Sequence, residues 1–300
     1  MILREHAMRY DAPVITNVPK LSSSARLVEL SISVWTGRKQ DKQATADAAN
    51  ANGADKTLLN TTKQLLGDCP ELDAVRKFAA NVRNFVYSST TPWGDLGQRF
   101  LPMARFPAFH KEITGMETEF ARLVDEFLKV YDFARAKAQA KLGSLWNADE
   151  YPSAEALRSK FRFTYCYAPV PDAGDERVDI GNEAEAYLHE EYRKHYTQRF
   201  EESMRNVWDR VYDQLKHMSE RIDYTNDNKK RFNDTLVSNL RDLVGMLPDF
   251  NVGNDPRMTR LHAELDAALV GVTPDGLRED QSLRSETKRK VDDILKNMSW

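Results

Sequence analysis

The sequence predicts an α+β protein that is predominantly α-helical, with two long antiparallel helices, further helices and a small sheet of two or three strands. Apolar residues recur every three or four positions over two long stretches, 109–142 and 188–222, as they do on one face of a helix. Two shorter stretches, 27–35 and 161–168, alternate apolar and polar residues as half-buried strands do. With only 13 Gly and 12 Pro in 300 residues, the chain has little material for the tight turns of an all-β fold.

The chain begins with a polar segment that prolines interrupt, and we expect residues 1–25 to be a flexible tail or, alternatively, a binding arm. The first strand follows, with Val28 and Ile32 on one face and Glu29 and Ser31 on the other. This strand should pair with the strand at 161–168. Its alternation indicates one face on a core and one face in water.

A cluster of charge stands where this first strand ends. Arg38, Lys39 and Lys42 follow Trp35 closely, and a short helix over 41–54 comes next. Cations on a rigid strand end are well placed to bind an acidic partner. If Trp35 were exposed beside them, it could also stack on an unpaired base.

The strand at 161–168 carries Phe161, Phe163, Tyr165 and Tyr167 on one face and Arg162 on the other, with Thr164 and Cys166. An aromatic face of this kind is typical of a core between a sheet and a helix. The alternative is a platform on which unpaired bases stack, with Arg162 contacting phosphate. Exposure of the polar face would exclude the platform.

Helices of the predicted length need long partners, either in the same chain or in a second subunit. The second long helix carries a wide aromatic stripe, which we interpret as an oligomer interface. Its members are Tyr192, Tyr196, Phe200, Trp208 and Tyr212. After this helix and the next, residues 249–256 are predicted to link a main domain at 26–248 to a helical appendage at 257–300.

Composition and motifs argue against several functional classes. A net charge of −3 excludes a globally basic nucleic-acid-binding protein, although not a local basic patch. No phosphate-binding glycine loop, nucleophile elbow or metal-binding helix motif occurs, and His189 and His195 are too far apart on a helix to share a metal ion. The two cysteines are interpreted as reduced thiols. We therefore expect no enzyme, no cofactor and no metal site, and no stretch is apolar enough to span a membrane.

Four blocks of the sequence resemble an uncharacterised family of bacteriophage and prophage proteins. They are "LSISVWTGRKQDK", "TTPWGDLGQRFLP", "DEYPSAEALRSKFRF" and "PVPDAGDERVDI". They occur in the family's order between about Leu27 and Val252, and the chain departs from the pattern at Glu176, where an aromatic residue is expected. The resemblance implies no established activity and no catalytic residues. Because such genes are often found near MoxR-type AAA+ ATPases and phage DNA-metabolism genes, it implies an ATPase partner.

These observations lead to one leading hypothesis and one alternative. We expect a non-catalytic, self-associating phage protein, located in the cytoplasm (of the host, if phage-encoded), that acts through protein contacts, with a MoxR-type AAA+ ATPase as a candidate partner. The alternative is a protein that binds or anneals single-stranded DNA.

Overall fold

The computed structural model describes residues 21–94, 97–171, 182–224 and 232–298. They form two compact units, each assembled from separate stretches of the chain. Unit 1 takes in residues up to Glu29, then 89–107, then Tyr167 onward, and unit 2 takes in residues 30–88 and 108–166. Residues 1–20 of the expected tail lie outside the described residues. So do Val178 and Ile180, through which the sequence allows a third short strand.

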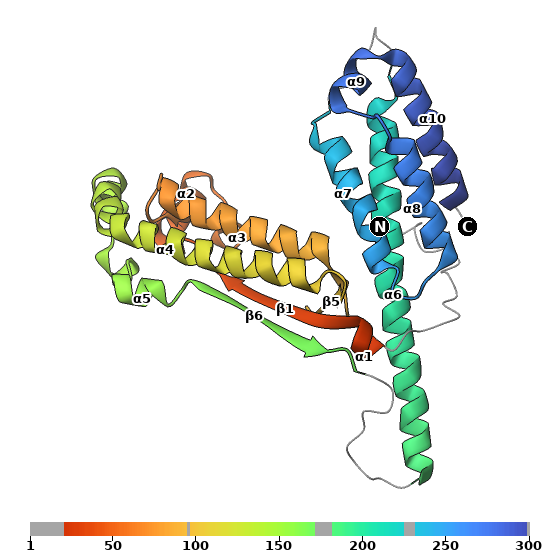
Figure 1. Cartoon of the computed structure of the whole chain (residues 1–300). Coiled ribbons are helices and arrows are strands. Elements are labelled where there is room, and N and C mark those ends of the chain that lie inside the picture. The colour runs from red at the N-terminus through yellow and green to blue at the C-terminus, as the bar shows by residue number, and fades with distance from the viewer. Residues whose placement is uncertain (1–20, 95–96, 172–181, 225–231, 299–300) are drawn as a thin grey trace. The chain divides into compact units, whose positions relative to one another are not determined.

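Unit 1 is mainly helical. Its elements are α1 (Leu21–Ser24), the start of β1 (Ala25–Ser33), β4 (Thr91–Pro92), β5 (Arg99–Pro102), the end of β6 (Arg162–Pro169), α6 (Asn182–Ile222), α7 (Thr235–Phe250), α8 (Pro256–Leu269), α9 (Pro274–Glu279) and α10 (Gln281–Met298). Figure 1 shows α6, α7, α8 and α10 side by side. Each contacts two of the others, α6 and α8 both lying against α7 and α10, so the four helices form a bundle.

Unit 2 combines strands with a helical hairpin. Its elements are the end of β1, β2 (Arg38–Gln40), α2 (Lys42–Ala51), β3 (Thr62–Gln64), α3 (Pro70–Ser89), α4 (Phe106–Leu142), α5 (Ala154–Arg158), the start of β6, and short 3-10 turns at Lys56–Leu58, Gly143–Leu145 and Ala148–Glu150. In Figure 1, α3 and α4 lie along one face of β1 and β6. Side chains from all four elements share one core, which includes Ile32, Val75, Phe127 and Phe163.

The predicted fold class is confirmed, and the sheet is larger than expected. Four antiparallel strands are ordered β4-β5-β1-β6, and β2 and β3 form a second, two-stranded sheet. The predicted pairing of the first strand with the aromatic strand corresponds to the neighbours β1 and β6. On its other side β1 pairs with β5, Ala25 lying opposite Pro102 and Val28 opposite Arg99.

The two long helices exist but are packed differently from the prediction. Phe120, Phe127 and Tyr131 of α4 belong to the core of unit 2, with α3 and β6. The apolar stripe of α6 belongs to the core of unit 1, with α7, α8 and α10. Each long helix therefore finds its partners inside its own unit, α4 being covered by α3 and β6 and α6 by α7 and α10.

The structure also differs from the predicted linker and appendage. Helix α7 continues through Pro248 to Phe250, which is fully buried, and α8 begins a few residues later with Asp255 as its N-cap. Leu265 of α8 and Val291 of α10 are buried in the same cluster as Leu240 of α7. Residues 249–256 therefore form the end of a helix and a tight connection within one bundle.

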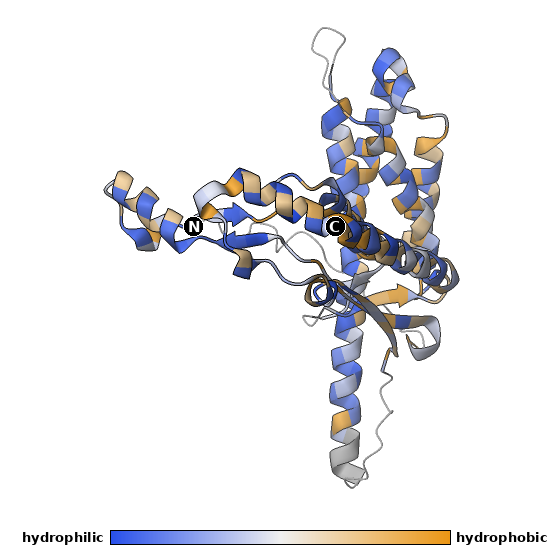
Figure 2. Cartoon of the chain, turned by 90° about the vertical axis from the view of Figure 1, so that its left-hand side faces the viewer, coloured by the Kyte–Doolittle hydropathy of each residue, from blue (hydrophilic) through white to orange (hydrophobic). Residues whose placement is uncertain are grey.

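The helices of both units are amphipathic. Figure 2 shows hydrophilic and hydrophobic residues alternating around them, as expected for helices with one face on a core. None of the helices in the described part of the chain is both long and apolar enough to cross a bilayer.

Candidate functional site: the charged exit of strand β1

A sharp turn at Gly37 carries the chain from β1 into β2. Gly37 has a φ of +57°, and a Cβ atom there would lie 3.2 Å from side-chain atoms of both Arg76 and Leu72. The Arg76 guanidinium donates a hydrogen bond to the carbonyl of Thr36, and the Gly37 carbonyl accepts one from the amide of Leu65 at 2.8 Å. The positive φ and the two close neighbours both favour glycine here, and the two hydrogen bonds hold the direction in which the chain leaves β1.

The predicted cations lie just beyond this turn and are all exposed. Arg38 and Lys39 are on β2, which pairs with β3, and Lys42 is the first residue of α2. We call Arg38, Lys39 and Lys42 the basic patch. Because successive residues of a strand face opposite sides, the patch extends around the edge of the hairpin. None of its three side chains forms an ion pair with another described residue, so their charges face solvent.

A lysine that the sequence analysis did not single out holds the hairpin in place. The Lys63 ammonium on β3 lies 3.1 Å from a carboxylate oxygen of Asp41 and 2.8 Å from one of Glu150, and it donates to the carbonyl of Leu145 at 2.7 Å. All three charged side chains are at least four-fifths buried. Lys63 therefore ties β3, the start of α2 and the segment after α4 together.

The pKa values of Lys63 and Asp41 are both shifted in the direction that favours their charged forms. Hydrogen bonding to Glu150, and then to Asp41, raises the pKa of Lys63 above its usual value. The pKa of Asp41 is lowered, first by the hydrogen bond from the Ala44 amide that caps α2 and then by Lys63. Asp41 thus caps the helix that carries Lys42 and binds the lysine that anchors β3.

Two aromatic residues complete this anchor. The Tyr151 hydroxyl donates to the carbonyl of Leu65, directly after β3, at 2.5 Å. The Trp146 ring lies against the Tyr151 ring, with 4.1 Å between centroids. Burial raises the pKa of Tyr151 to about 12, so its hydroxyl remains a hydrogen-bond donor at any physiological pH. The basic patch therefore stands on a rigid support.

Trp35 is not an exposed ring beside the patch, which corrects its assignment as a binding residue. It is partly buried and packs on the core of unit 2, 6.3 Å from the Phe127 ring and 6.1 Å from the Tyr131 ring, centroid to centroid. It lies two residues beyond the end of β1, where Phe127 and Tyr131 of α4 cover the chain. The Trp35 ring packs next to the turn at Gly37.

The aromatic face of β6 is likewise a packing surface. The Phe161 ring lies 5.6 Å from the Phe127 ring, and the Phe163 ring lies 5.6 Å from the Phe120 ring, centroid to centroid. Phe120 and Phe127 both belong to α4. The exposed residues on the opposite face of β6 are Arg162, Thr164 and Cys166. Because the polar face is the exposed one, a stacking platform on the aromatic face is excluded. Arg162 stands on a separate element from the basic patch, on the uncovered face of β6.

The predicted oligomer interface on α6 is divided by the structure. Phe200 and Trp208 are core residues of unit 1, with exposed fractions of 0% and 6%, so they cannot bind a second subunit. Tyr196 and Tyr212 are partly buried against the same core. Of the five residues, Tyr192 alone is exposed, with 40% of its surface accessible. The apolar stripe on α6 is wide because two helices, α7 and α10, pack against it.

Comparisons with known proteins returned no match: no family model, no curated protein and no solved structure is significantly similar to this chain. Among the described residues, no group of three or more His, Cys, Asp or Glu side chains is arranged to hold a metal ion. The function of this chain must therefore be inferred from its own geometry.

Proposed function

We propose that this protein is a non-catalytic binding protein that acts through protein contacts, and that the basic patch binds an acidic segment of its partner. The observation that carries the proposal is the exposure of Arg38, Lys39 and Lys42 on a rigid support, without carboxylate partners among the described residues. Exposed cations on a backbone that is held in place steer an oppositely charged partner toward the surface.

Two features favour a protein partner over single-stranded DNA. The side chains best suited to base stacking, Trp35 and the aromatic face of β6, are packed against α4. Three cations without an aromatic ring match carboxylates on a protein surface as well as phosphates, but they provide no contact to bases. Binding of single-stranded DNA remains the alternative function to test.

The resemblance to phage proteins suggests which partner to test first. A MoxR-type AAA+ ATPase encoded beside such a gene is the first candidate, and a phage origin and a cytoplasmic location belong to the same proposal. The patch requires that the ATPase, or another partner, presents a run of Asp or Glu residues.

The test is a fluorescence-anisotropy titration with two labelled probes, a Glu-rich peptide and single-stranded DNA, at about 50 and 200 mM salt. We expect the peptide to bind and its affinity to fall with salt, because the contacts are exposed. Reversing all three patch charges (R38E, K39E and K42E) should weaken binding about tenfold, since each exposed ion pair contributes about 0.2–1 kcal/mol.

The matched control reverses three other exposed lysines of unit 2, all on α4 (K129E, K137E and K141E). It changes the net charge equally and should leave peptide binding nearly unchanged. Equal weakening in both variants would mean that overall charge matters and the patch does not. Salt-sensitive binding of the DNA without binding of the peptide would replace the proposal with the nucleic-acid alternative. If the protein bound neither probe and no candidate ATPase, both the proposal and the nucleic-acid alternative would be overturned.

A further inference from the structure

Strand β2, which carries two of the three cations of the basic patch, lies at the edge of its sheet. Among the described strands β3 is its one neighbour, whereas β1 lies between β5 and β6 in the larger sheet. All three residues of β2 are exposed. An edge strand presents a row of backbone N–H and C=O groups with which another extended chain can pair. The charged exit of β1 therefore includes an open strand edge.

The hydrogen bonds of the hairpin show which backbone groups of β2 face its partner strand. The amide of Leu65 donates to the carbonyl of Gly37 at 2.8 Å, and the amide of Asp41 donates to the carbonyl of Thr61 at 2.9 Å. In an antiparallel pair, residues that face the partner with their N–H and C=O groups alternate with residues whose groups point away from it. Every second residue from Gly37 to Asp41 therefore faces β3.

The two residues in between, Arg38 and Gln40, direct their N–H and C=O groups away from β3. Together they offer two donors and two acceptors, which have no hydrogen-bond partner among the residues that the structure describes. Because side chains alternate along a strand, Arg38 and Gln40 lie on one face of β2 and Lys39 lies on the other. A chain that pairs with this edge therefore has a cation beside it on both faces.

The charges of the edge decide which strand can pair with it. Lysine and arginine on an edge strand discourage pairing with ordinary strands, whereas opposite charges across two strands stabilise a sheet. A second copy of β2 does not meet this requirement. In the antiparallel pairing that uses both Arg38 and Gln40, Lys39 lies opposite Lys39 of the second copy, and like charges in that position are destabilising. The edge thus matches an extended segment of acidic residues.

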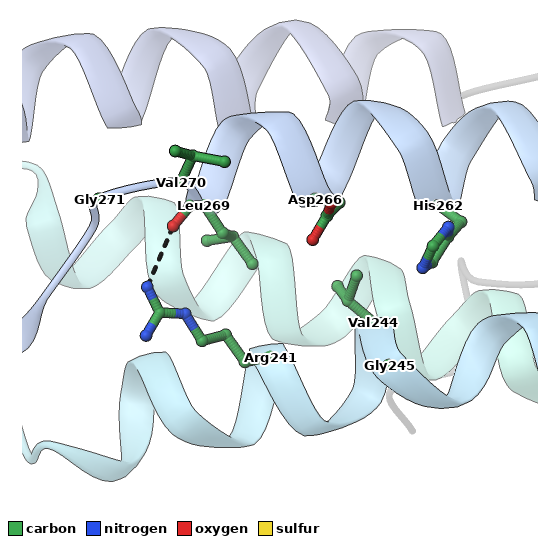
Figure 3. Close-up of a pocket in the computed structure, with 8 residues that line it drawn as sticks. All are labelled: Arg241, Val244, Gly245, His262, Asp266, Leu269, Val270 and Gly271. Atoms are coloured by element: carbon green, nitrogen blue, oxygen red, sulfur yellow. Dashed lines mark hydrogen bonds between the residues drawn. The ribbon is translucent and has the colours of Figure 1, made fainter.

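A hollow of about 340 Å³ between α7 and α8 is less suited to an acidic segment. Figure 3 shows Arg241 on one side of it and Asp266 on the other. The Arg241 guanidinium donates to the carbonyl of Leu269 at 3.1 Å, drawn as the dashed line in Figure 3, and to that of Val272 at 2.6 Å. This cation is already hydrogen-bonded and shares the hollow with a carboxylate, whereas the basic patch has no carboxylate partner among the described residues.

We propose, on the basis of the function proposed above, that the acidic segment of the partner binds to β2 as an added β-strand. Its backbone pairs with Arg38 and Gln40, and its carboxylates lie beside the basic patch. In strand addition of this kind, main-chain hydrogen bonds give affinity and side chains give specificity. The hairpin becomes a three-stranded sheet, and such sheets are more stable than isolated hairpins. The partner segment is therefore extended and not helical.

The first test is amide hydrogen exchange, measured by NMR on the full chain with and without the Glu-rich peptide. The amides of Arg38 and Gln40 should exchange at least about tenfold more slowly with bound peptide, because they become hydrogen-bonded. Thr62 and Gln64 lie opposite Gln40 and Arg38 in the hairpin, so their amides face outward on β3 and serve as the internal control. Protection of these β3 amides instead, or unchanged exchange at β2 with peptide bound, would overturn the proposal.

The second test uses proline, which has no backbone N–H. Gln40→Pro removes an outward-facing donor and keeps the hydrogen bonds between β2 and β3, as proline does on an edge strand. It should weaken peptide binding about tenfold, as expected for the loss of about two hydrogen bonds. Two matched controls should bind the peptide like the wild-type chain. Thr62→Pro removes an outward-facing donor from the opposite edge, and Gln40→Ala removes the side chain alone.

Strand addition and the proposed function can fail separately. Wild-type binding by Gln40→Pro, or equal weakening by either control, would overturn strand addition. Peptide binding that is lost on charge reversal of the basic patch, without protection of the β2 amides, would keep the proposed function and overturn strand addition. The absence of peptide binding would overturn both. If Gln40→Pro shifted the amide signals of β3 and so disrupted the hairpin, exchange in the wild-type chain would decide.

Discussion

Unit 1 and unit 2 each bury a cation, and the contacts described for the two cations differ in kind. In unit 2, Lys63 lies between the carboxylates of Asp41 and Glu150, which come from distant parts of the sequence. In unit 1, Arg284 is 1% exposed, donates to the carbonyl of Leu277 at 2.8 Å and lies 4.1 Å above the Tyr224 ring. A helix bundle supplies carbonyls at helix ends, where the helix dipole is negative.

The difference shows what each unit needs from its charges. The bundle already has a large apolar core, and its buried arginine organises the connections around α9. Unit 2 has a smaller core, and its hairpin of two three-residue strands is held by ionic contacts of Lys63 in addition to the burial of Leu65 and Leu66. The surface that we propose for partner binding is thus supported in part by ion pairs.

The largest expected effects come from deleting a fully buried ring in each unit. Phe200→Ala in unit 1 and Phe127→Ala in unit 2 should each destabilise the protein by about 3–5 kcal/mol, through lost burial and the cavity left behind. Hydrogen exchange should localise each effect, with faster exchange in α7, α8 and α10 for the first variant and in α3 and α4 for the second. Equal acceleration in both regions would show that the two units open together.

The ionic anchor of unit 2 is tested by Lys63→Met. Removing the ammonium leaves two largely buried carboxylates facing each other, so we expect amides of β2 and β3 to exchange at least about tenfold faster. Lys56→Met changes an exposed lysine nearby in the sequence and serves as the control. If the two variants had the same exchange rates, apolar contacts alone would be holding the hairpin.

The pH dependence of the same anchor follows from its two pKa shifts. The pKa of Asp41 is lowered from 3.8, so its stabilisation is complete above that pH and is lost as the pH falls further. The pKa of Lys63 is raised from 10.5, so its stabilisation is complete below that pH and is lost as the pH rises further. NMR signals of the β2 and β3 amides should stay constant between these limits. Movement of the signals near neutral pH would contradict this assignment.

The smallest effects should come from the two open helical glycines, one in each unit. Gly245→Ala in α7 and Gly115→Ala in α4 should each stabilise the protein by about 0.5–1 kcal/mol, because alanine restricts the unfolded chain and meets no neighbour. Urea unfolding monitored by circular dichroism measures both. Destabilisation by either substitution would mean that the space beside that glycine is occupied in solution.

Local patterns predicted local structure well and partners poorly. Alternation around Val28 and Ile32 was sufficient to identify β1, and the aromatic period of two identified β6 and its core-facing side. Periodicity on α6 showed which face is apolar, but not that α7 and α10 cover it. Phe200 could therefore be assigned to an interface as reasonably as to a core.

The candidate site was predicted only in part, for a similar reason. Arg38, Lys39 and Lys42 were visible as a cluster, whereas Lys63 is a single lysine in an unremarkable stretch. Its importance comes from Glu150, which reaches it only after the chain has folded. Ion pairs between distant segments leave no periodic signal in a sequence, so sequence analysis finds the exposed charges and misses their support.

The division of the chain between the units also bears on the order of synthesis. Every segment of unit 2 has been translated once residue 166 emerges from the ribosome. Unit 1 also uses early segments, including α1 and β5, but its bundle waits for α10 at the end of the chain. Domains generally fold as units during translation. Unit 2 can therefore complete its core first, while β5 and the start of β1 wait for helices that have not yet been made.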